Sequence, residues 1–386
     1  MLKQNKIKYI GYYYSPELGQ PKRLYSPAAA TKMDYVASTL VQNDYDVEIL
    51  SLCKPEKEGI VFNKKTHHHN GYTINLIASL GTGNKLRNVL DYFLGNLILF
   101  LILIFKTKKN EMVFVYHSLG YGKTITLAKQ IRKFKLVLEV EEIYQDAVTC
   151  STRQRKQEKN NIMAADAYIF PTYILNSELN TSNKPSIVIH GTYSIQKNDS
   201  ESACTDGFIN VVYAGTFDIK KGGVYAAIKT AQYLPEIYKI HILGFGSDEE
   251  VKSVESLIKQ VNDSSSSKVF FHGLITGKDF TDFLFSCSIG LSTQEPNAKY
   301  NETSFPSKVL TYMAHGLQVV SVRIKAVEGS DIGGYIHFYD SNRLELIAET
   351  IKNIDLQKIT DTRDVISDLD IKTIKKMSNF ISSVTQ

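Results

Sequence analysis

Short apolar strands alternate with helical segments through the second half of the chain, from Val211 to Ser321. Each expected strand ends in a turn that contains glycine or other small polar residues. The expected strands are residues 209–213, 239–243, 268–271, 288–291 and 318–322. This alternation predicts an α/β fold with a parallel sheet. Ligands of such sheets bind outside the carboxyl ends of the strands.

The turns at these strand ends suit a phosphorylated ligand. They are Gly215 to Gly223, Gly244 to Gly246, His272-Gly273, and Ser304 to Lys308 ahead of an expected helix at 309–315. Backbone N–H groups at helix N-termini bind phosphate, and a lysine such as Lys221 adds a compact positive charge. We therefore predict that a nucleotide binds at this edge of the sheet.

In their order, these segments resemble the nucleotide-binding half of the GT-B glycosyltransferases, in particular the large retaining family 4 of the bacterial surface-polysaccharide type. The matching segments are Tyr213 to Gly215 with Lys221-Gly222, Ile242 to Gly246, Val269 to Gly273, and Ser304 to Val320. The resemblance is clear over 205–325 and looser over 1–190. It implies two Rossmann-like domains with parallel sheets that face a central cleft.

The length of 386 residues also favours two domains. We expect an acceptor-binding domain at 1–195 and a nucleotide-sugar-binding domain at 205–355. Residues 356–386 are expected to form a C-terminal helix that, by the resemblance, crosses back to the first domain.

The resemblance also implies a donor site. Lys221 stands where the family has the lysine that neutralises the donor β-phosphate. The other implied donor-site residues are Gly19, Gly215, Thr216, Gly244, Gly246, His272, Gly273, Thr303, Ser304, Phe305, Ser307, Lys308 and Thr311. The nucleotide sugar, UDP- or GDP-linked, is a substrate, so we expect no cofactor.

Three residues depart from the family pattern. Thr216 follows Gly215 where the family usually has arginine, and Thr303 and Thr311 stand in place of two glutamates eight residues apart. A threonine hydroxyl bonds a ribose more weakly than a carboxylate does. Glu302 or Asn301 are candidates to compensate. The departures keep open an alternative, a non-catalytic GT-B-like binding or partner subunit. The segment 205–325 has no Asp-x-Asp motif, so nothing in the expected donor site demands a metal.

In the first half, polar residues end two consecutive expected strands. His117 follows the strand 112–116, and Glu141 and Glu142 follow the strand 136–140. By the resemblance, residues at these two ends face the donor sugar, so His117, Glu141 and Glu142 join Lys221 as the catalytic candidates. The alternative is that the glutamates cap the next helix.

The segment Tyr92–Phe105 is almost continuously apolar, and Lys106, Lys108 and Lys109 follow it. Its fourteen residues are fewer than the roughly 18–20 that span a bilayer. This predicts a buried helix before the strand 112–116. The alternative is a helix that lies in the membrane interface, with the lysines on anionic headgroups.

Charge and cysteine usage favour the inner face of a membrane. Residues 1–200 carry 26 Lys+Arg and 17 Asp+Glu, a net charge of +9, whereas residues 201–386 carry −4. The four cysteines lie far apart and no signal peptide is expected, which fits a reducing, cytoplasmic location. The turn at His67-His68-His69 lacks the spacing of a metal site.

The predicted activity is therefore that of a retaining, hexosyltransferase-type glycosyltransferase. It would move a sugar from a nucleotide-sugar donor to a lipid-linked or oligosaccharide acceptor, in cell-surface polysaccharide synthesis. We expect a cytoplasmic protein with peripheral membrane contact and no nucleic-acid partner.

Overall fold

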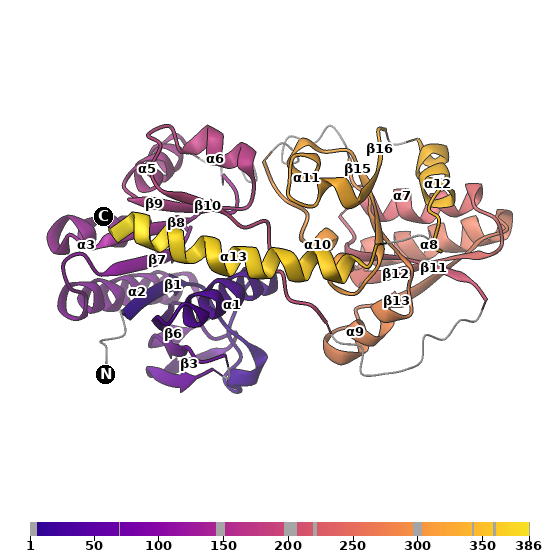
Figure 1. Cartoon of the computed structure of the whole chain (residues 1–386). Helices are drawn as coiled ribbons and strands as arrows, with labels where there is room; N and C mark the ends of the chain where they lie inside the picture. The colour runs from indigo at the N-terminus through magenta and orange to yellow at the C-terminus, as the bar shows by residue number, and fades with distance from the viewer. Residues whose placement is uncertain are drawn as a thin grey trace. The chain divides into compact units, whose positions relative to one another are not determined.

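A computed structural model of the chain describes residues 6–68, 70–143, 151–196, 207–218, 222–295, 303–341, 343–357 and 360–385. It divides into two compact units (Figure 1). Unit 1 comprises Met1–Thr192 with Ile371–Gln386, and unit 2 comprises Tyr193–Asp370. The last helix, α13 (Thr362–Thr385), therefore begins in unit 2, and its residues from Ile371 onward belong to unit 1.

Unit 1 is built on an eight-stranded sheet of order β10-β9-β8-β7-β1-β2-β5-β4, in which β4 alone pairs antiparallel. Its strands are β1 (Lys6–Gly11), β2 (Asp46–Ser51), β4 (Lys64–His67), β5 (Thr73–Leu76), β7 (Met112–Tyr116), β8 (Lys135–Glu139), β9 (Ala167–Phe170) and β10 (Ser186–Val188). A separate antiparallel pair is formed by β3 (Glu58–Val61) and β6 (Ser79–Gly81). The helices are α1 (Pro27–Gln42), α2 (Lys85–Lys106), α3 (Gly122–Arg132), α5 (Thr152–Met163) and α6 (Tyr173–Leu179).

Unit 2 has a six-stranded, wholly parallel sheet of order β13-β12-β11-β14-β15-β16. The strands are β11 (Ile209–Thr216), β12 (Tyr238–Phe245), β13 (Lys268–Gly273), β14 (Ile289–Ser292), β15 (Gln318–Val322) and β16 (Ile336–Tyr339). The helices are α7 (Gly223–Thr230), α8 (Asp248–Ser264), α9 (Gly277–Phe285), α10 (Ser307–Ala314), α11 (Lys325–Glu328) and α12 (Leu344–Lys352). The predicted α/β class and the five predicted strands of this half are confirmed.

Both sheets reverse their strand order next to their first strand. In unit 2 the chain runs outward from β11 to β13 and then returns to place β14 on the other side of β11. In unit 1 it returns in the same way to place β7 beside β1. Crevices for ligands form at such reversal points, at the carboxyl ends of the strands. The topology thus directs attention to the residues after β11 and β14, and after β1 and β7.

Local sequence explains where the helices begin. Ser26 caps α1 by accepting a hydrogen bond from Ala29 N at 3.4 Å, and Pro27 occupies the first helical position, as predicted. Ser247 and Glu250 form a reciprocal capping box at the start of α8. The C-terminal helix expected within 356–386 is α13, which begins at Thr362.

The prediction of a buried helix at Tyr92–Phe105 is wrong. The segment belongs to α2, a helix of 22 residues in which Leu99 and Leu103 are the only fully buried side chains. By length and composition alone α2 is apolar enough to cross a membrane, and 11% of its most apolar stretch is buried. It nevertheless packs along α3 and β6 (Figure 1). The run is apolar on the side that faces away from the core as well as on the side that contacts it.

Candidate functional site

Two helix N-termini follow the two central strands of unit 2. Helix α7 begins at Gly223 after β11, with Gly222 as its N-cap, and α10 begins at Ser307 after β14, with Pro306 as its N-cap. Neither helix has a side-chain cap, whereas α8 has a capping box and three acidic residues in its first turn. The described helices α9, α11 and α12 also lack a side-chain cap, but each has an acidic residue in its first turn, whereas α7 and α10 have none. Backbone N–H groups at the starts of α7 and α10 are therefore well suited to bind an anion.

Lys308 places a positive charge beside the turn after β11. A Cβ atom built on Gly215 would lie 3.2 Å from Lys308 Nζ. The same ammonium group lies 4.1 Å from the centre of the Tyr213 ring. The structure thus brings together Gly215 and Lys308, two of the residues that the sequence assigned to the donor site.

Glycine is required at two of these turns. Gly244 has φ +146°, and a Cβ there would overlap the carbonyl oxygen of Gly215 on the paired strand. Gly223 opens α7 against the Thr293 carbonyl, which leaves no room for a side chain. The turns therefore keep β11, β12 and the start of α7 close together.

Tyr312 holds α10 against the sheet. Its buried hydroxyl accepts a hydrogen bond from Ala214 N at 2.8 Å, and its ring packs on Gly290 of β14. Burial raises the pKa of Tyr312, so the hydroxyl stays neutral. This contact explains why a tyrosine stands in the motif, and it fixes the helix that carries Lys308.

The remaining donor-site candidates of unit 2 lie on the same edge or near it. Thr216 is exposed at the end of β11, and Thr303, Ser304 and Phe305 lead into α10 with partial exposure. Ser307 and Thr311 lie in the first turns of α10, where Thr311 Oγ1 donates to the Ser307 carbonyl at 3.2 Å.

The next three candidates lie at the ends of β12 and β13: Gly246, His272 and Gly273. Gly246 precedes the capped helix α8, and Gly273 has φ +68°. His272 forms a hydrogen bond with His241 at 3.0 Å and contacts the ring of Phe283, and burial lowers its pKa. Lys221, Asn301 and Glu302 lie outside the described residues.

In unit 1, His117 lies at the end of β7, next to β8 as predicted. Its side chain is 3% exposed, and its Nε2 lies 3.9 Å from Glu158 Oε1. Burial lowers the pKa of His117 to about 4, although a hydrogen bond to the backbone of Glu142 opposes the shift. His117 is therefore a neutral, buried histidine, and its contact with a donor sugar stays a prediction.

The two glutamates after β8 differ from each other. Glu142 is exposed, while Glu141 is partly buried with one carboxylate oxygen 3.4 Å from Lys32 Nζ. The Lys32 side chain is buried and also donates to the Ile189 carbonyl. Glu141 thus belongs to an ion pair, and its predicted role toward a sugar is not tested by this geometry.

A third carboxylate, which the sequence did not single out as a candidate, lies beneath this pair. Glu139 is buried and accepts a hydrogen bond from the Tyr9 hydroxyl. Burial and the nearby Glu141 carboxylate raise the pKa of Glu139 to about 8. Glu139 Oε1 is buried without a hydrogen-bond partner among the described residues, so a proton held by Glu139 satisfies its carboxyl group beside Glu141.

Gly19, the remaining candidate, lies in the loop after β1 with φ +73°. Its carbonyl accepts a hydrogen bond from the Tyr14 hydroxyl at 2.5 Å. Together with Arg23 and Lys64 it lines a hollow of about 280 Å³. The Arg23 guanidinium is buried there, donating to the carbonyls of Cys53 and Ile77.

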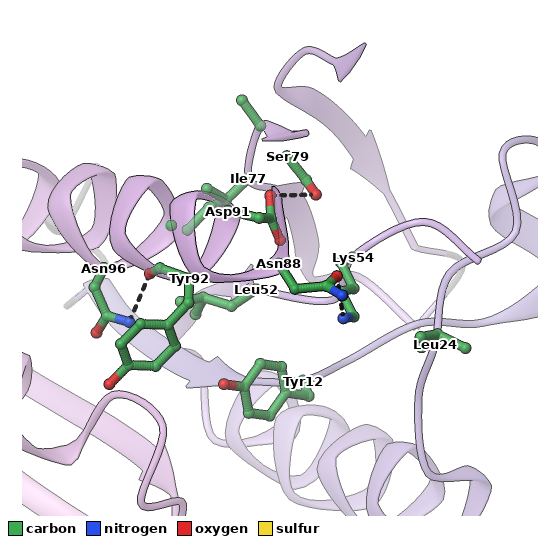
Figure 2. Close-up of a pocket in the computed structure, with 12 residues that line it drawn as sticks. Tyr12, Leu24, Leu52, Lys54, Ile77, Ser79, Asn88, Asp91, Tyr92 and Asn96 are labelled. Carbon is green, nitrogen blue, oxygen red and sulfur yellow. Dashed lines mark hydrogen bonds between the residues drawn. The ribbon is translucent and has the colours of Figure 1, made fainter. Parts of the chain in front are cut away.

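A larger pocket, of about 370 Å³, lies beside α2 in unit 1 (Figure 2). We call it the α2 pocket. Its lining residues are Tyr12, Leu24, Leu52, Lys54, Ile77, Ala78, Ser79, Asn88, Asp91, Tyr92, Gly95 and Asn96. Tyr12, Leu52 and Ile77 follow the carboxyl ends of β1, β2 and β5, so the pocket lies at the ligand-binding edge of this sheet.

The sequence contained a signal for this pocket. Asn88, Asp91 and Asn96 are polar residues three to five positions apart in an otherwise apolar helix. That spacing places them on one side of α2. Polar residues on one side of a mostly apolar helix indicate that this side contacts polar groups or a ligand. In α2 these residues line the pocket (Figure 2).

Comparison with known proteins shows the fold. No protein-family model matches the chain, and no curated protein matches it by sequence. Among solved structures, a UDP-forming alpha,alpha-trehalose-phosphate synthase from Burkholderia xenovorans, in complex with glucose-6-phosphate, has a TM-score of 0.64 at 8% identity. That match covers 99% of this chain and 100% of the other.

Two further structures agree. Anabaena HepE, in complex with UDP and glucose, matches with a TM-score of 0.64 and 13% identity, covering 98% of this chain and 100% of that one. A glycosyltransferase from Rickettsia africae matches with a TM-score of 0.62 and 10% identity, covering 99% and 98%. The chain therefore has the GT-B fold, with two Rossmann-like domains, as the resemblance predicted.

Proposed function

We propose that this protein is a glycosyltransferase that takes its sugar from a nucleotide diphosphate donor bound to unit 2. The observation that carries the proposal is the meeting of Lys308 with the Gly215 turn, between the uncapped starts of α7 and α10. Helix N-termini and a lysine are what a diphosphate needs, both for binding and for the charge that its leaving group develops. HepE, which shares the fold, was solved with UDP and with UDP-glucose, so UDP is the first nucleotide to test.

Nucleotide binding tests the donor site directly. Thermal shift and calorimetric titration with UDP, GDP and ADP should identify one nucleotide that binds. Lys308→Gln should weaken its binding by about tenfold, since a hydrogen bond to a charged group contributes roughly 1.5–3 kcal/mol. Lys259→Gln, an exposed lysine on α8, is the matched control and should bind as the unaltered protein does. Equal affinities for the two variants would contradict the assignment.

Turnover tests the catalytic step. Nucleotide release should be measured against a panel of nucleotide sugars with lipid-linked acceptors. By the resemblance, Lys221 neutralises the departing β-phosphate, so Lys221→Ala should lose roughly 2–4 kcal/mol of transition-state stabilisation. A folded Lys221→Ala protein with near-full turnover would remove Lys221 from the mechanism.

The alternative function, a GT-B-like binding protein without catalysis, is supported by the residues at positions 303 and 311. Thr303 and Thr311 replace the family's two glutamates, and the Thr311 hydroxyl is already bonded within its own helix. Loss of ribose contacts would leave a GT-B-like protein that binds a partner without transferring sugar. Absence of binding for all three nucleotides would favour this alternative over the enzyme.

We propose further that the transferase is of the retaining family 4 type, transfers a hexose, and acts on a lipid-linked glycan acceptor in cell-surface polysaccharide synthesis. Its place would be the cytoplasmic face of the membrane. The exposed apolar side of α2 and the basic residues that follow it support this location. Analysis of the product anomer by NMR would test retention.

A further inference from the structure

The α2 pocket has the composition of a site for a neutral, hydroxyl-rich group. Tyr12, Leu52 and Ile77 give it apolar walls, and Lys54 and Asp91 are its only charged residues among those described. One positive and one negative charge do not favour a strongly charged ligand. The C–H faces of a sugar ring pack well on aromatic rings, and its hydroxyls bond to charged side chains.

Polar atoms in the pocket remain available for such a ligand. Asp91 Oδ1 accepts from Ser79 Oγ and Leu80 N, both at 2.7 Å, while its other oxygen accepts nothing from the residues that the structure describes. Among the described residues, Lys54 Nζ donates only to Asn88 Oδ1, at 3.1 Å, which leaves two of its N–H donors for a ligand (Figure 2). The pocket therefore offers one acceptor and several donors that protein contacts have already positioned.

Next to the pocket, α2 presents an apolar stripe that no described part of the chain covers. Its side chains are 43–77% exposed: Leu86, Val89, Leu90, Phe93, Leu97, Leu101 and Phe105. With roughly 100° between successive residues, the stripe is centred on the side of α2 opposite the pocket residues. Leu127 and Ile131 of the neighbouring α3, 51% and 56% exposed, extend the surface. Contiguous exposure of this extent marks an interaction site.

Charge identifies the partner of this stripe. Asp91 is the only acidic residue in α2, and it faces the pocket, while α3 has none. Basic residues stand at both ends of α2 and at the C-terminal end of α3: Lys85, Arg87, Lys106, Lys108, Lys109, Arg132 and Lys133. Apolar side chains between lysines and arginines match a bilayer surface with anionic headgroups.

We infer that the α2 pocket binds the sugar headgroup of a lipid-borne acceptor, and that the α2 stripe lies in the membrane that holds this lipid. The inference rests on the proposed function for the identity of the acceptor. The geometry gives one helix with a polar side toward the pocket and an apolar side toward solvent. A glycolipid needs both surfaces, because its sugar headgroup extends out of the bilayer while its hydrocarbon chains stay inside it.

The membrane part is tested by flotation of the full chain with vesicles. Binding should be stronger to phosphatidylcholine vesicles that contain phosphatidylglycerol than to pure phosphatidylcholine, and should fall with added salt. Leu97→Gln should lower vesicle binding by about tenfold, because it removes one buried leucine side chain from the lipid contact. Leu274→Gln, which alters a leucine that is 62% exposed in unit 2, should have no effect.

The pocket part is tested with octyl β-glucoside, below its micelle concentration, observed by saturation-transfer NMR. Both its sugar and alkyl protons should receive saturation, and Asp91→Asn, with unchanged thermal stability, should weaken binding by about tenfold. If Asp91→Asn and the unaltered protein bind octyl β-glucoside equally well, the α2 pocket is not the sugar site. If Asp91→Asn proves unstable, Tyr92→Phe replaces it. This variant removes the hydroxyl of a half-exposed residue that lines the pocket, and it should also weaken binding.

Two outcomes separate this inference from its alternatives. A dimer in light scattering that Leu97→Gln dissociates would assign the stripe to a second copy of the chain and overturn the membrane assignment. A UDP titration on the same samples tests unit 2 independently. Failure to bind nucleotide together with sugar-dependent binding of octyl β-glucoside would refute the proposed function and leave the lipid site standing.

Discussion

At the scale of single residues, the fold holds Glu139 in its protonated form. Burial and the Glu141 carboxylate raise its pKa from 4.5 to about 8. The native protein therefore keeps a proton that the unfolded chain releases. The stabilisation from this proton is complete below pH 4.5 and is lost as the pH rises through about 8.

Glu139→Gln removes this dependence, because an amide cannot ionise and still accepts the hydrogen bond from Tyr9. We expect the melting temperature of the variant to fall less than that of the unaltered protein between about pH 5 and about pH 9. At about pH 9 the loss of stability of the unaltered protein should exceed that of the variant by roughly 1–3 kcal/mol. Thermal melts across the pH range provide the measurement, with Glu255→Gln, an exposed α8 residue, as control. Parallel curves for all three proteins would show that Glu139 is ionised in the fold.

The sequence predicted some of these residues and not others, for physical reasons. Gly215 and Lys308 were assigned to one site from the motif, and the structure puts them in contact range. His117 was placed correctly at a strand end, but its ring is buried. A strand end fixes the edge of the sheet at which a residue lies and leaves the direction of its side chain to the packing of later helices. Glu139 was missed as a candidate because its pKa depends on burial, which no spacing reveals.

At the scale of elements, the Tyr312 hydroxyl ties α10 to β11, in addition to the buried apolar side chains of the helix. Tyr312→Phe leaves the ring in place and removes the acceptor of Ala214 N. An unsatisfied backbone N–H costs about 1–3 kcal/mol, so the melting temperature should drop by several degrees. Because α10 carries Lys308, nucleotide affinity should fall as well. Tyr225→Phe, which alters a surface hydroxyl 3.4 Å from Ser253 Oγ, should change neither quantity. A stable Tyr312→Phe protein with full affinity would show that α10 is held by other contacts.

Helix α2 shows the limit of reading an element from composition. The apolar run correctly predicted a helix before β7 and wrongly predicted that it would be buried. A helix apolar on every side is buried either in protein or in lipid, and periodicity does not distinguish the two environments. Whether protein covers such a helix depends on how much apolar surface the rest of the chain presents to it, which is a property of the tertiary packing. The polar residues on the pocket side were the part of the pattern that pointed to function.

At the scale of the whole molecule, the two proposed sites lie in different units. The basic half of the chain contains α2 and its pocket, and the half with a net charge of −4 contains the proposed nucleotide site. Each unit has its own sheet and its own buried core. Proteins of this kind depart from two-state unfolding, because each domain can melt separately.

Nucleotide should therefore stabilise one unit more than the other. Scanning calorimetry of the full chain should show two transitions, of which saturating UDP raises only that of unit 2. At a concentration 100 times the dissociation constant, ligand binding adds about 2.7 kcal/mol, which corresponds to roughly 5–10 °C for a domain of this size. In Lys308→Gln the same UDP concentration should produce a much smaller shift, because the nucleotide binds more weakly. Equal shifts of both transitions would mean that the two units unfold together, coupled through α13. A shift confined to the transition of unit 1 would show that the nucleotide binds unit 1, and would contradict the assignment of the donor site to unit 2.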